Sequence, residues 1–126
     1  MTLKLFASAS LLVLLTSAVG SLYAIDLGFL DQAPLRFLTD SDTRLLDETI
    51  TDVLVNANDG ESRSWKGEDS ANSGTVTAVR SFQKDARPCR RLEVVTLAPK
   101  AAYGRGTSLV DICEIDGEWK ILRLPH

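Results

Sequence analysis

The chain of 126 residues is poor in the side chains on which most catalytic and metal sites depend. It contains one histidine, His126, at the last position, and chain ends fray. A serine hydrolase needs a base beside its nucleophile, and a metal site needs several clustered ligands. The sequence therefore predicts no catalytic set, no metal site and no cofactor, and we expect a protein that is not an enzyme.

Cysteine and net charge are also scarce. Cys89 and Cys113 are the two cysteines, and their spacing is not that of a Cys-x-x-Cys redox motif. Seventeen acidic residues against 14 basic ones give a net charge of −3. The basic run Arg87, Arg90, Arg91 is interrupted and has acidic neighbours, which favours a solvated strand face. An acidic chain without a basic cluster is a poor candidate for binding nucleic acid.

One long apolar run stands at the N-terminus. It covers residues 5–19, follows Lys4 and precedes the small residues Gly20 and Ala24. This is the pattern of a secretory signal peptide over residues 1–24, with cleavage after Gly20 or Ala24. The alternative is an uncleaved anchor, because residues 5–25 could just span a bilayer. We expect membrane association only in that case.

Export determines the oxidation state that we expect for the two cysteines. In an oxidising compartment two cysteines most simply form one disulfide, which here joins Cys89 to Cys113. On the chain-entropy model, closing a loop of this size stabilises the fold by about 3.5 kcal/mol. That is a large share of the stability of a small domain.

A β-hairpin is predicted around the cysteines. Strand-forming residues flank a segment that contains proline and glycine. If the cysteines pair, the reversal centres on Ala101, and Arg91 faces Asp111 on the same side of the sheet as the cysteines. Side chains alternate between the faces of a strand, so the other face is largely apolar. Its members are Arg90, Leu92, Val94, Val110 and Ile112.

The clearest helix is predicted before the strands. Thr39 is a good N-cap residue, and Asp42 stands three positions later, an acidic variant of the capping box. An apolar stripe at helical spacing follows, made of Leu46, Ile50, Val53, Leu54 and Ala57. The acids off this stripe are Asp42, Asp47, Glu48 and Asp52. They could suggest a cation site, but a solvated helix face is favoured because nothing places them around one point.

Further strands are predicted on both sides of the hairpin. Residues 61–66 form one, with Trp65 pointing inward, and residues 75–83 form another with strict alternation. The last strand, 118–124, follows an Asp-Gly turn. The expected fold is therefore α+β, with one N-terminal amphipathic helix packed on an antiparallel sheet of about four to five strands and one intradomain disulfide.

The predicted domain covers residues 38–126. Residues 25–37 are expected to form an irregular lead-in or linker between the signal peptide and the domain. Three apolar residues near its end are expected to dock on the domain: Leu35, Phe37 and Leu38.

Several of these pieces together resemble a known family. The segments LTDSDTRLLDETI, NSGTVTAVRSF and PCRRLEV, with a second cysteine and DGEWKI after them, look like the C-terminal domain of bacterial surface-antigen proteins of the 17-kilodalton type. The resemblance covers residues 38–121. It implies an exported cell-envelope protein with a structural or interaction role, whose partner is an unknown envelope component. The chain lacks the lipidated cysteine and glycine-rich zipper of well-known members, so we expect a periplasmic domain.

An alternative function is a periplasmic module that binds a small ligand or an anion. A curved sheet on a helix can leave a pocket between them. Arginine suits a carboxylate or a phosphate, and the candidates are Arg80, Arg90 and Arg123. The competing and favoured interpretation places these three at strand edges in water. Trp65 and Trp119 are predicted to fill the core, with a role at an interface as the alternative.

Overall fold

Helix α1 spans Asp40–Asn56 in the computed structural model, which describes residues 33–101 and 104–122. It begins at the predicted capping box. The Thr39 hydroxyl accepts a hydrogen bond from the Asp42 N–H at 3.1 Å, and the Asp42 carboxylate accepts one from the Thr39 N–H at 3.1 Å. Two N–H groups that would otherwise be unpaired at the helix start are thereby satisfied. Beyond the other end, Gly60 adopts a φ of +90°.

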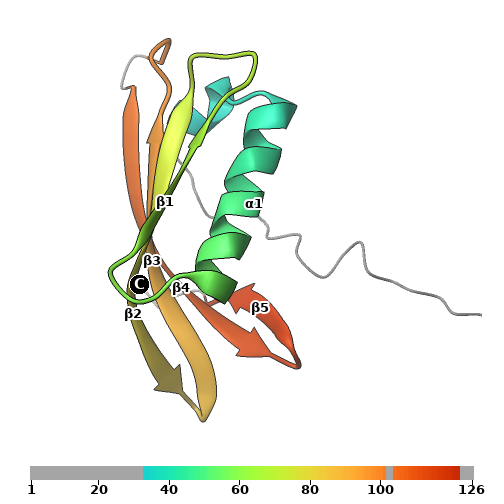
Figure 1. The fold of residues 1–126 in the computed structure, drawn as a ribbon, viewed down its shortest axis with the longest axis vertical. Coiled ribbons are helices and arrows are strands. Elements are labelled where there is room, and N and C mark those ends of the chain that lie inside the picture. The colour runs from blue at the N-terminus through green and yellow to red at the C-terminus, as the bar shows by residue number, and fades with distance from the viewer. Residues whose placement is uncertain (1–32, 102–103, 123–126) are drawn as a thin grey trace, which may run out of the picture.

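Five antiparallel strands follow the helix in chain order: β1 (Ser62–Lys66), β2 (Ser73–Lys84), β3 (Arg87–Leu97), β4 (Arg105–Ile115) and β5 (Glu118–Ile121). Each strand pairs with the next, so the sheet is a meander. Figure 1 shows α1 lying across one face of this twisted sheet. The predicted α+β fold with one disulfide is confirmed.

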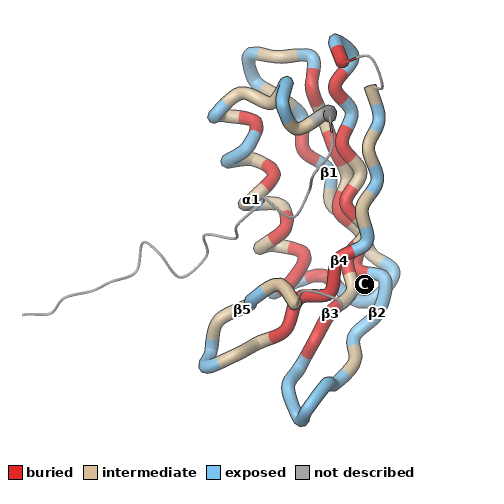
Figure 2. The backbone as a smooth tube through the Cα atoms, turned by 180° about the vertical axis from the view of Figure 1, so that it is seen from behind, coloured by how far each residue is buried: buried red, intermediate tan, exposed pale blue. Residues whose placement is uncertain are grey.

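The core fills the space between α1 and the face of the sheet that α1 covers, which we call the inner face (Figure 2). All five residues of the predicted helical stripe are buried. From the sheet, Trp65, Val76, Ala78, Leu92, Val94, Val110 and Ile112 meet them. Burying one large aliphatic side chain contributes roughly 1.5–3 kcal/mol, so this two-layer contact is the main source of stability.

The β3–β4 register is the one predicted from the cysteines. Cys89 lies opposite Cys113, and Arg91 lies opposite Asp111. The two Sγ atoms are joined at 1.99 Å, and each cysteine is 1% exposed. The Arg91 guanidinium donates to both oxygens of Asp111, at 2.7 and 3.0 Å. These side chains lie on the outer face, the side of the sheet away from α1.

β2 departs from the strict alternation predicted for it. The register shifts between Ala78 and Arg80, which makes Val79 an extra residue in a β-bulge. An extra residue exchanges the two faces of the strand beyond it. Ser81 therefore lies on the inner face, and Arg80 and Phe82 lie on the outer face, opposite residues of β3 that share it.

The ends of the domain differ from prediction in detail. A 3₁₀ helix, η2, spans Ala33–Phe37 in the part predicted as irregular. Leu35 and Leu38 pack on the core as predicted, but Phe37 is 46% exposed. Residues three apart share one side of a 3₁₀ turn, which leaves Phe37 on the other side.

β5 ends at Ile121 rather than at residue 124. The predicted signal peptide, its two cleavage sites and the start of the lead-in lie outside the described residues, as do Arg123 and His126. Within residues 33–101 and 104–122, no helix has both the length and the apolar character needed to cross a bilayer.

Candidate functional site

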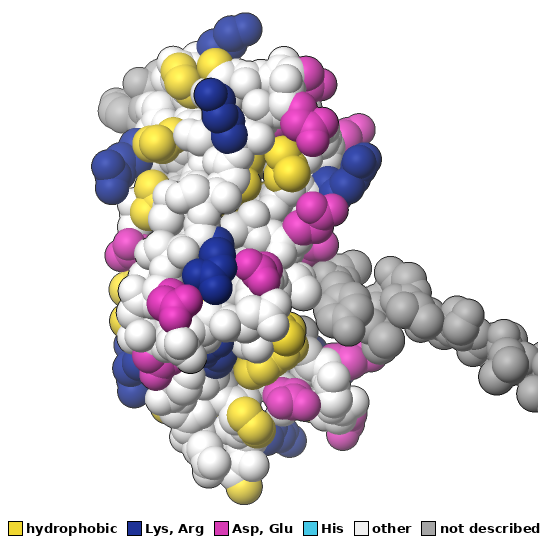
Figure 3. All heavy atoms as spheres, viewed as in Figure 1, with side chains coloured by type: hydrophobic (Ala, Val, Ile, Leu, Met, Phe, Trp, Pro, Cys, Tyr) yellow, Lys and Arg dark blue, Asp and Glu magenta, His cyan; other side chains and the backbone are white. Residues whose placement is uncertain are grey.

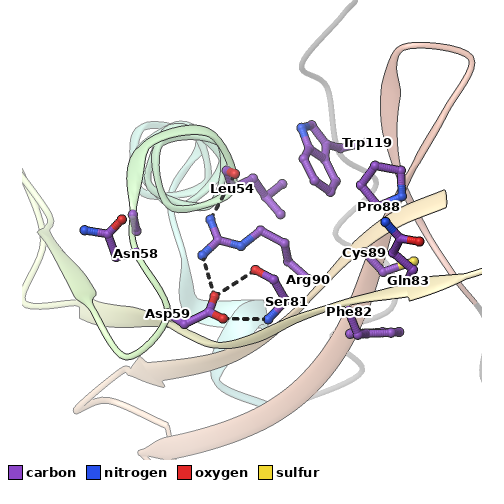
Figure 4. Close-up of a pocket in the computed structure, with 11 residues that line it drawn as sticks. Leu54, Asn58, Asp59, Ser81, Phe82, Gln83, Pro88, Cys89, Arg90 and Trp119 are labelled. Carbon is purple, nitrogen blue, oxygen red and sulfur yellow. Dashed lines mark hydrogen bonds and ion pairs between the residues drawn. The ribbon is translucent and has the colours of Figure 1, made fainter.

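An open groove lies at the C-terminal end of α1, between the β2–β3 hairpin and β5. Its volume is about 690 Å³. Its apolar lining residues are Leu54, Ala57, Pro88 and Trp119, and it is bordered by Phe82 and Cys89, whose side chains project from the outer face. The polar part comes from Asn58, Asp59, Ser81, Gln83 and Arg90. We call this feature the helix-end groove (Figure 4).

The groove exists because the hairpins are longer than the helix. The 17 residues of α1 reach about 25 Å at ~1.5 Å per residue. The 12 residues of β2 reach about 40 Å at ~3.3 Å per residue. The sheet therefore continues past the end of α1, as Figure 1 shows, and its inner face there has no helix to cover it.

The β2–β3 and β4–β5 hairpins each close through a two-residue turn. Asp85 and Ala86 have φ values of 52° and 62°, and Asp116 and Gly117 have φ values of 53° and 80°. Two successive positive φ angles mark the type I′ turn, whose twist matches that of paired strands. The second turn is the predicted Asp-Gly turn. Ala86 takes a position where glycine is the usual residue.

Arg90 closes the end of α1 that faces the groove. It is 8% exposed, and its Nη1 donates to the carbonyls of Val53 and Leu54 at 2.7 and 3.1 Å. Carbonyls in the last helical turn lack partners within the helix, and that end of the helix dipole attracts a cation. The favoured prediction of a solvated arginine at a strand edge is wrong for Arg90, because the inner face carries its side chain under the helix end.

Asp59 completes this arrangement from the loop after α1. Its carboxylate accepts from Arg90 Nη2 at 3.0 Å, from the Ser81 N–H at 2.9 Å and from the Ser81 hydroxyl at 2.8 Å (Figure 4). The hydrogen bonds from Ser81 first, and then that from Arg90, lower the pKa of Asp59. The bulge at Val79 is what brings Ser81 to this face.

The charges of the groove therefore neutralise each other. Asp59 and Arg90 are the ionisable side chains among the described residues that line it, since Cys89 is in the disulfide. The Nε of Arg90 is buried without a hydrogen-bond partner among the described residues. Figure 4 places its guanidinium between Leu54 and Asp59.

The two tryptophans lie in different environments. Trp65 is 5% exposed and belongs to the core cluster, where its indole packs against Gly74, its partner across β1 and β2. Trp119 is half-buried: it packs on the edge of the core and also lines the groove. Figure 4 shows its indole projecting from β5 on the side of the groove opposite Asp59.

The bulge places Arg80 on the outer face of the sheet, whereas Arg90 lies on the inner face. Arg80 is exposed on the outer face, with its guanidinium carbon 4.7 Å from the centre of the Phe82 ring. Nearby, the hydrogen bonds from Arg91 lower the pKa of Asp111.

Figure 3 shows acidic and basic side chains interspersed on the face it presents, with no continuous patch of either sign.

A second polar cluster lies at the opposite end of α1. Asp42 is fully buried and accepts hydrogen bonds from the Ser70 hydroxyl and from Asn72 Nδ2, both at 2.9 Å. Asn72 Nδ2 also donates to the Phe37 carbonyl at 2.9 Å. The prediction of a solvated acidic helix face is therefore wrong for Asp42, which ties the loop before β2 to the helix start. No local signal marks Ser70 or Asn72 as its partners.

Residues 33–101 and 104–122 offer no metal-binding geometry. They hold no group of three or more His, Cys, Asp or Glu side chains placed around one point. The carboxylates of α1 do not converge, since Asp42 turns inward and Glu48 is exposed.

Comparison with family models, with curated proteins and with solved structures gave no significant similarity in any of the three. The resemblance to surface-antigen domains therefore stays a prediction from the sequence. The structure adds the disulfide, which is typical of proteins that fold outside the cytoplasm.

Proposed function

We propose that this chain is an exported, non-enzymatic cell-envelope protein that binds another envelope component in the helix-end groove. The observation that carries the proposal is the Cys89–Cys113 disulfide. Such bonds persist in oxidising compartments and are rare in the cytoplasm. The disulfide joins β3 to β4 where the two hairpins that flank the groove separate, so it also holds the walls of the groove together.

The chemistry of the groove favours binding over catalysis. A general acid or base needs an ionisable group with a free proton or lone pair and a pKa near the working pH. Asp59 has a lowered pKa and accepts three hydrogen bonds, and Arg90 uses its guanidinium on the helix carbonyls. The pair supports the end of α1 and leaves apolar and amide side chains to meet a partner.

The alternative, a module that binds an anion, draws less support from this geometry. Among the described residues, Arg90 is the candidate arginine within the groove. An anion there would compete with Val53, Leu54 and Asp59 for the Nη1 and Nη2 groups, and the unpaired Nε is buried. The fixed carboxylate of Asp59 would repel it. Arg80 lies on the outer face, away from the groove.

Fractionation tests export, and site-specific photo-crosslinking tests the groove. We expect the mature chain in the envelope fraction, oxidised at both cysteines. A photo-crosslinking residue at Gln83, exposed in the groove, should capture one envelope component. The matched control carries the photo-crosslinking residue in place of Leu109, which is 60% exposed on the outer face. This control should not capture the component that the Gln83 position captures. A reduced cytoplasmic protein, or equal products from both positions, would contradict the proposal.

A further inference from the structure

We propose that the helix-end groove binds an uncharged oligosaccharide chain, with Trp119 as the aromatic surface on which a sugar ring packs. This inference rests on the proposed function and names the chemical class of the envelope component. It follows from the charge of the groove, from its free hydrogen-bonding groups and from the position of one indole.

The charge of the groove disfavours ions of either sign. Asp59 and Arg90 lie 3.0 Å apart and cancel each other. An anion that approaches Arg90 meets the Asp59 carboxylate, whose side chain is 47% exposed, and a cation that approaches Asp59 meets Arg90. An ion that enters loses hydration and gains no unpaired opposite charge, which is unfavourable. A neutral ligand avoids this loss.

The polar groups that remain free suit hydroxyl and amide partners. A carboxylate offers about four acceptor sites, and the Asp59 carboxylate accepts three hydrogen bonds, so it can accept one more. The exposed Gln83 amide carries both donors and an acceptor. A sugar hydroxyl both donates and accepts, so it can use both groups without carrying charge.

Trp119 supplies the apolar contact that a sugar ring needs. The C–H groups on one side of a pyranose ring form an apolar surface, and the flat face of an indole covers such a surface while its N–H stays available to a polar group. Trp119 is half-buried and held by the core, so it loses little freedom on binding. Trp65, at 5% exposed, is unavailable for this role.

The shape of the groove suits a chain rather than a single small molecule. Ligands of drug size are bound in sites that enclose most of their surface. This groove is open and runs between two hairpins beyond the end of α1, so it can contact several consecutive sugar units that continue past it.

The test is a binding measurement on the oxidised mature protein. The uncharged probes are the N-acetylglucosamine tetrasaccharide and maltotetraose, and the anionic probe is tetragalacturonate. At least one uncharged probe should shift the tryptophan emission to shorter wavelength and protect it from iodide quenching, while tetragalacturonate should do neither. Because Trp65 is already shielded by the core, the change reports on Trp119.

Variants then assign the effect to the groove, with affinity measured by calorimetry. Removing an aromatic anchor commonly weakens binding at least about tenfold, which is expected for Trp119→Ala. Trp119→Phe keeps a ring and its packing on the core, so it should fold and bind with intermediate affinity. Gln83→Ala changes an exposed groove side chain and should weaken binding severalfold, whereas Leu109→Ala on the outer face should bind as the unaltered protein does.

Three results would overturn the inference: no binding of either uncharged probe, equal binding of tetragalacturonate, or unaltered affinity in the folded Trp119 and Gln83 variants. Its failure can be told from failure of the proposed function. A specific crosslink from Gln83 to an envelope protein, without oligosaccharide binding, removes this inference and keeps the proposed function. Binding of an uncharged probe by a chain that stays in the cytoplasm removes the proposed function and keeps the oligosaccharide site.

Discussion

Replacing Asp42 by alanine should destabilise this fold far more than the loss of an ordinary helix-surface acid. Asp42 is 0% exposed, although it stands in the first turn of α1. Its carboxylate accepts from the Thr39 N–H, the Ser70 hydroxyl and the Asn72 amide. The alanine variant leaves these donors without that acceptor, at positions where Asn72 is buried and Thr39 and Ser70 are half-buried.

The magnitude follows from those donors. A buried donor left unpaired costs about 1–3 kcal/mol, which applies in full to Asn72 and in part to the half-buried donors of Thr39 and Ser70. Relief of the cost of burying a carboxylate offsets part of this loss. We expect a net loss of about 3 kcal/mol, which lowers the melting temperature by roughly 12–24 °C at about 4–8 °C per kcal/mol.

Asp40 provides the matched control. It lies in the same turn and meets the same helix dipole, but it is exposed. Asp40→Ala therefore removes the interaction with the dipole alone, which is about 1 kcal/mol or less. Thermal unfolding followed by circular dichroism compares the two variants. Equal losses for Asp40→Ala and Asp42→Ala would refute the role given to the buried cluster.

The pH dependence tests the same reasoning independently. Burial by itself raises the pKa of Asp42, but the hydrogen bonds from Asn72, Thr39 and Ser70 outweigh it and lower the pKa below the ordinary 3.8. The folded state thus binds the proton less tightly than the unfolded state. The resulting stability is fully present above the unfolded pKa and is lost as pH falls through the folded pKa. The difference in free energy of unfolding between the unaltered protein and Asp42→Ala should be constant near neutrality and should become smaller below about pH 4. A difference that grows on acidification would contradict the lowered pKa of Asp42.

Three further substitutions test other parts of the structure. Cys89→Ser should lower the free energy of unfolding in urea by about 3.5 kcal/mol, and an unchanged midpoint would show that the disulfide contributes nothing. Arg90→Met removes the donors from the end of α1, so it should cost about 2 kcal/mol and speed amide exchange in the last helical turn; unaltered exchange there would contradict the capping role. Ala86→Gly should raise stability by about 0.5–1 kcal/mol because the residue at this position has a φ of 62°, and a lower midpoint would argue against the type I′ turn.

Much of the fold could be predicted because its signals are local. The Thr39–Asp42 capping box depends on residues three apart, and the buried stripe of α1 depends on the 3.6-residue turn. The register of β3 on β4 follows once Cys89 and Cys113 are paired, because alternation then assigns every other side chain to a face.

The groove could not be predicted in the same way. Its walls come from α1, β2, β3 and β5, and its depth depends on how far the hairpins run beyond the helix. The bulge at Val79 has no marker in the sequence, yet it sends Ser81 to Asp59 and Arg80 to the outer face. A pattern with strict alternation assigns both residues to the wrong side.

The sequence by itself determined the order of the elements, the faces of α1 and the pairing of β3 with β4, because these depend on spacing along the chain. Only the tertiary structure decided that Asp42 is buried, that Arg90 caps the helix and that Trp119 stays partly open. The environment of a side chain is set by whatever lies over it, and in this protein the covering residues come from elements distant in the chain.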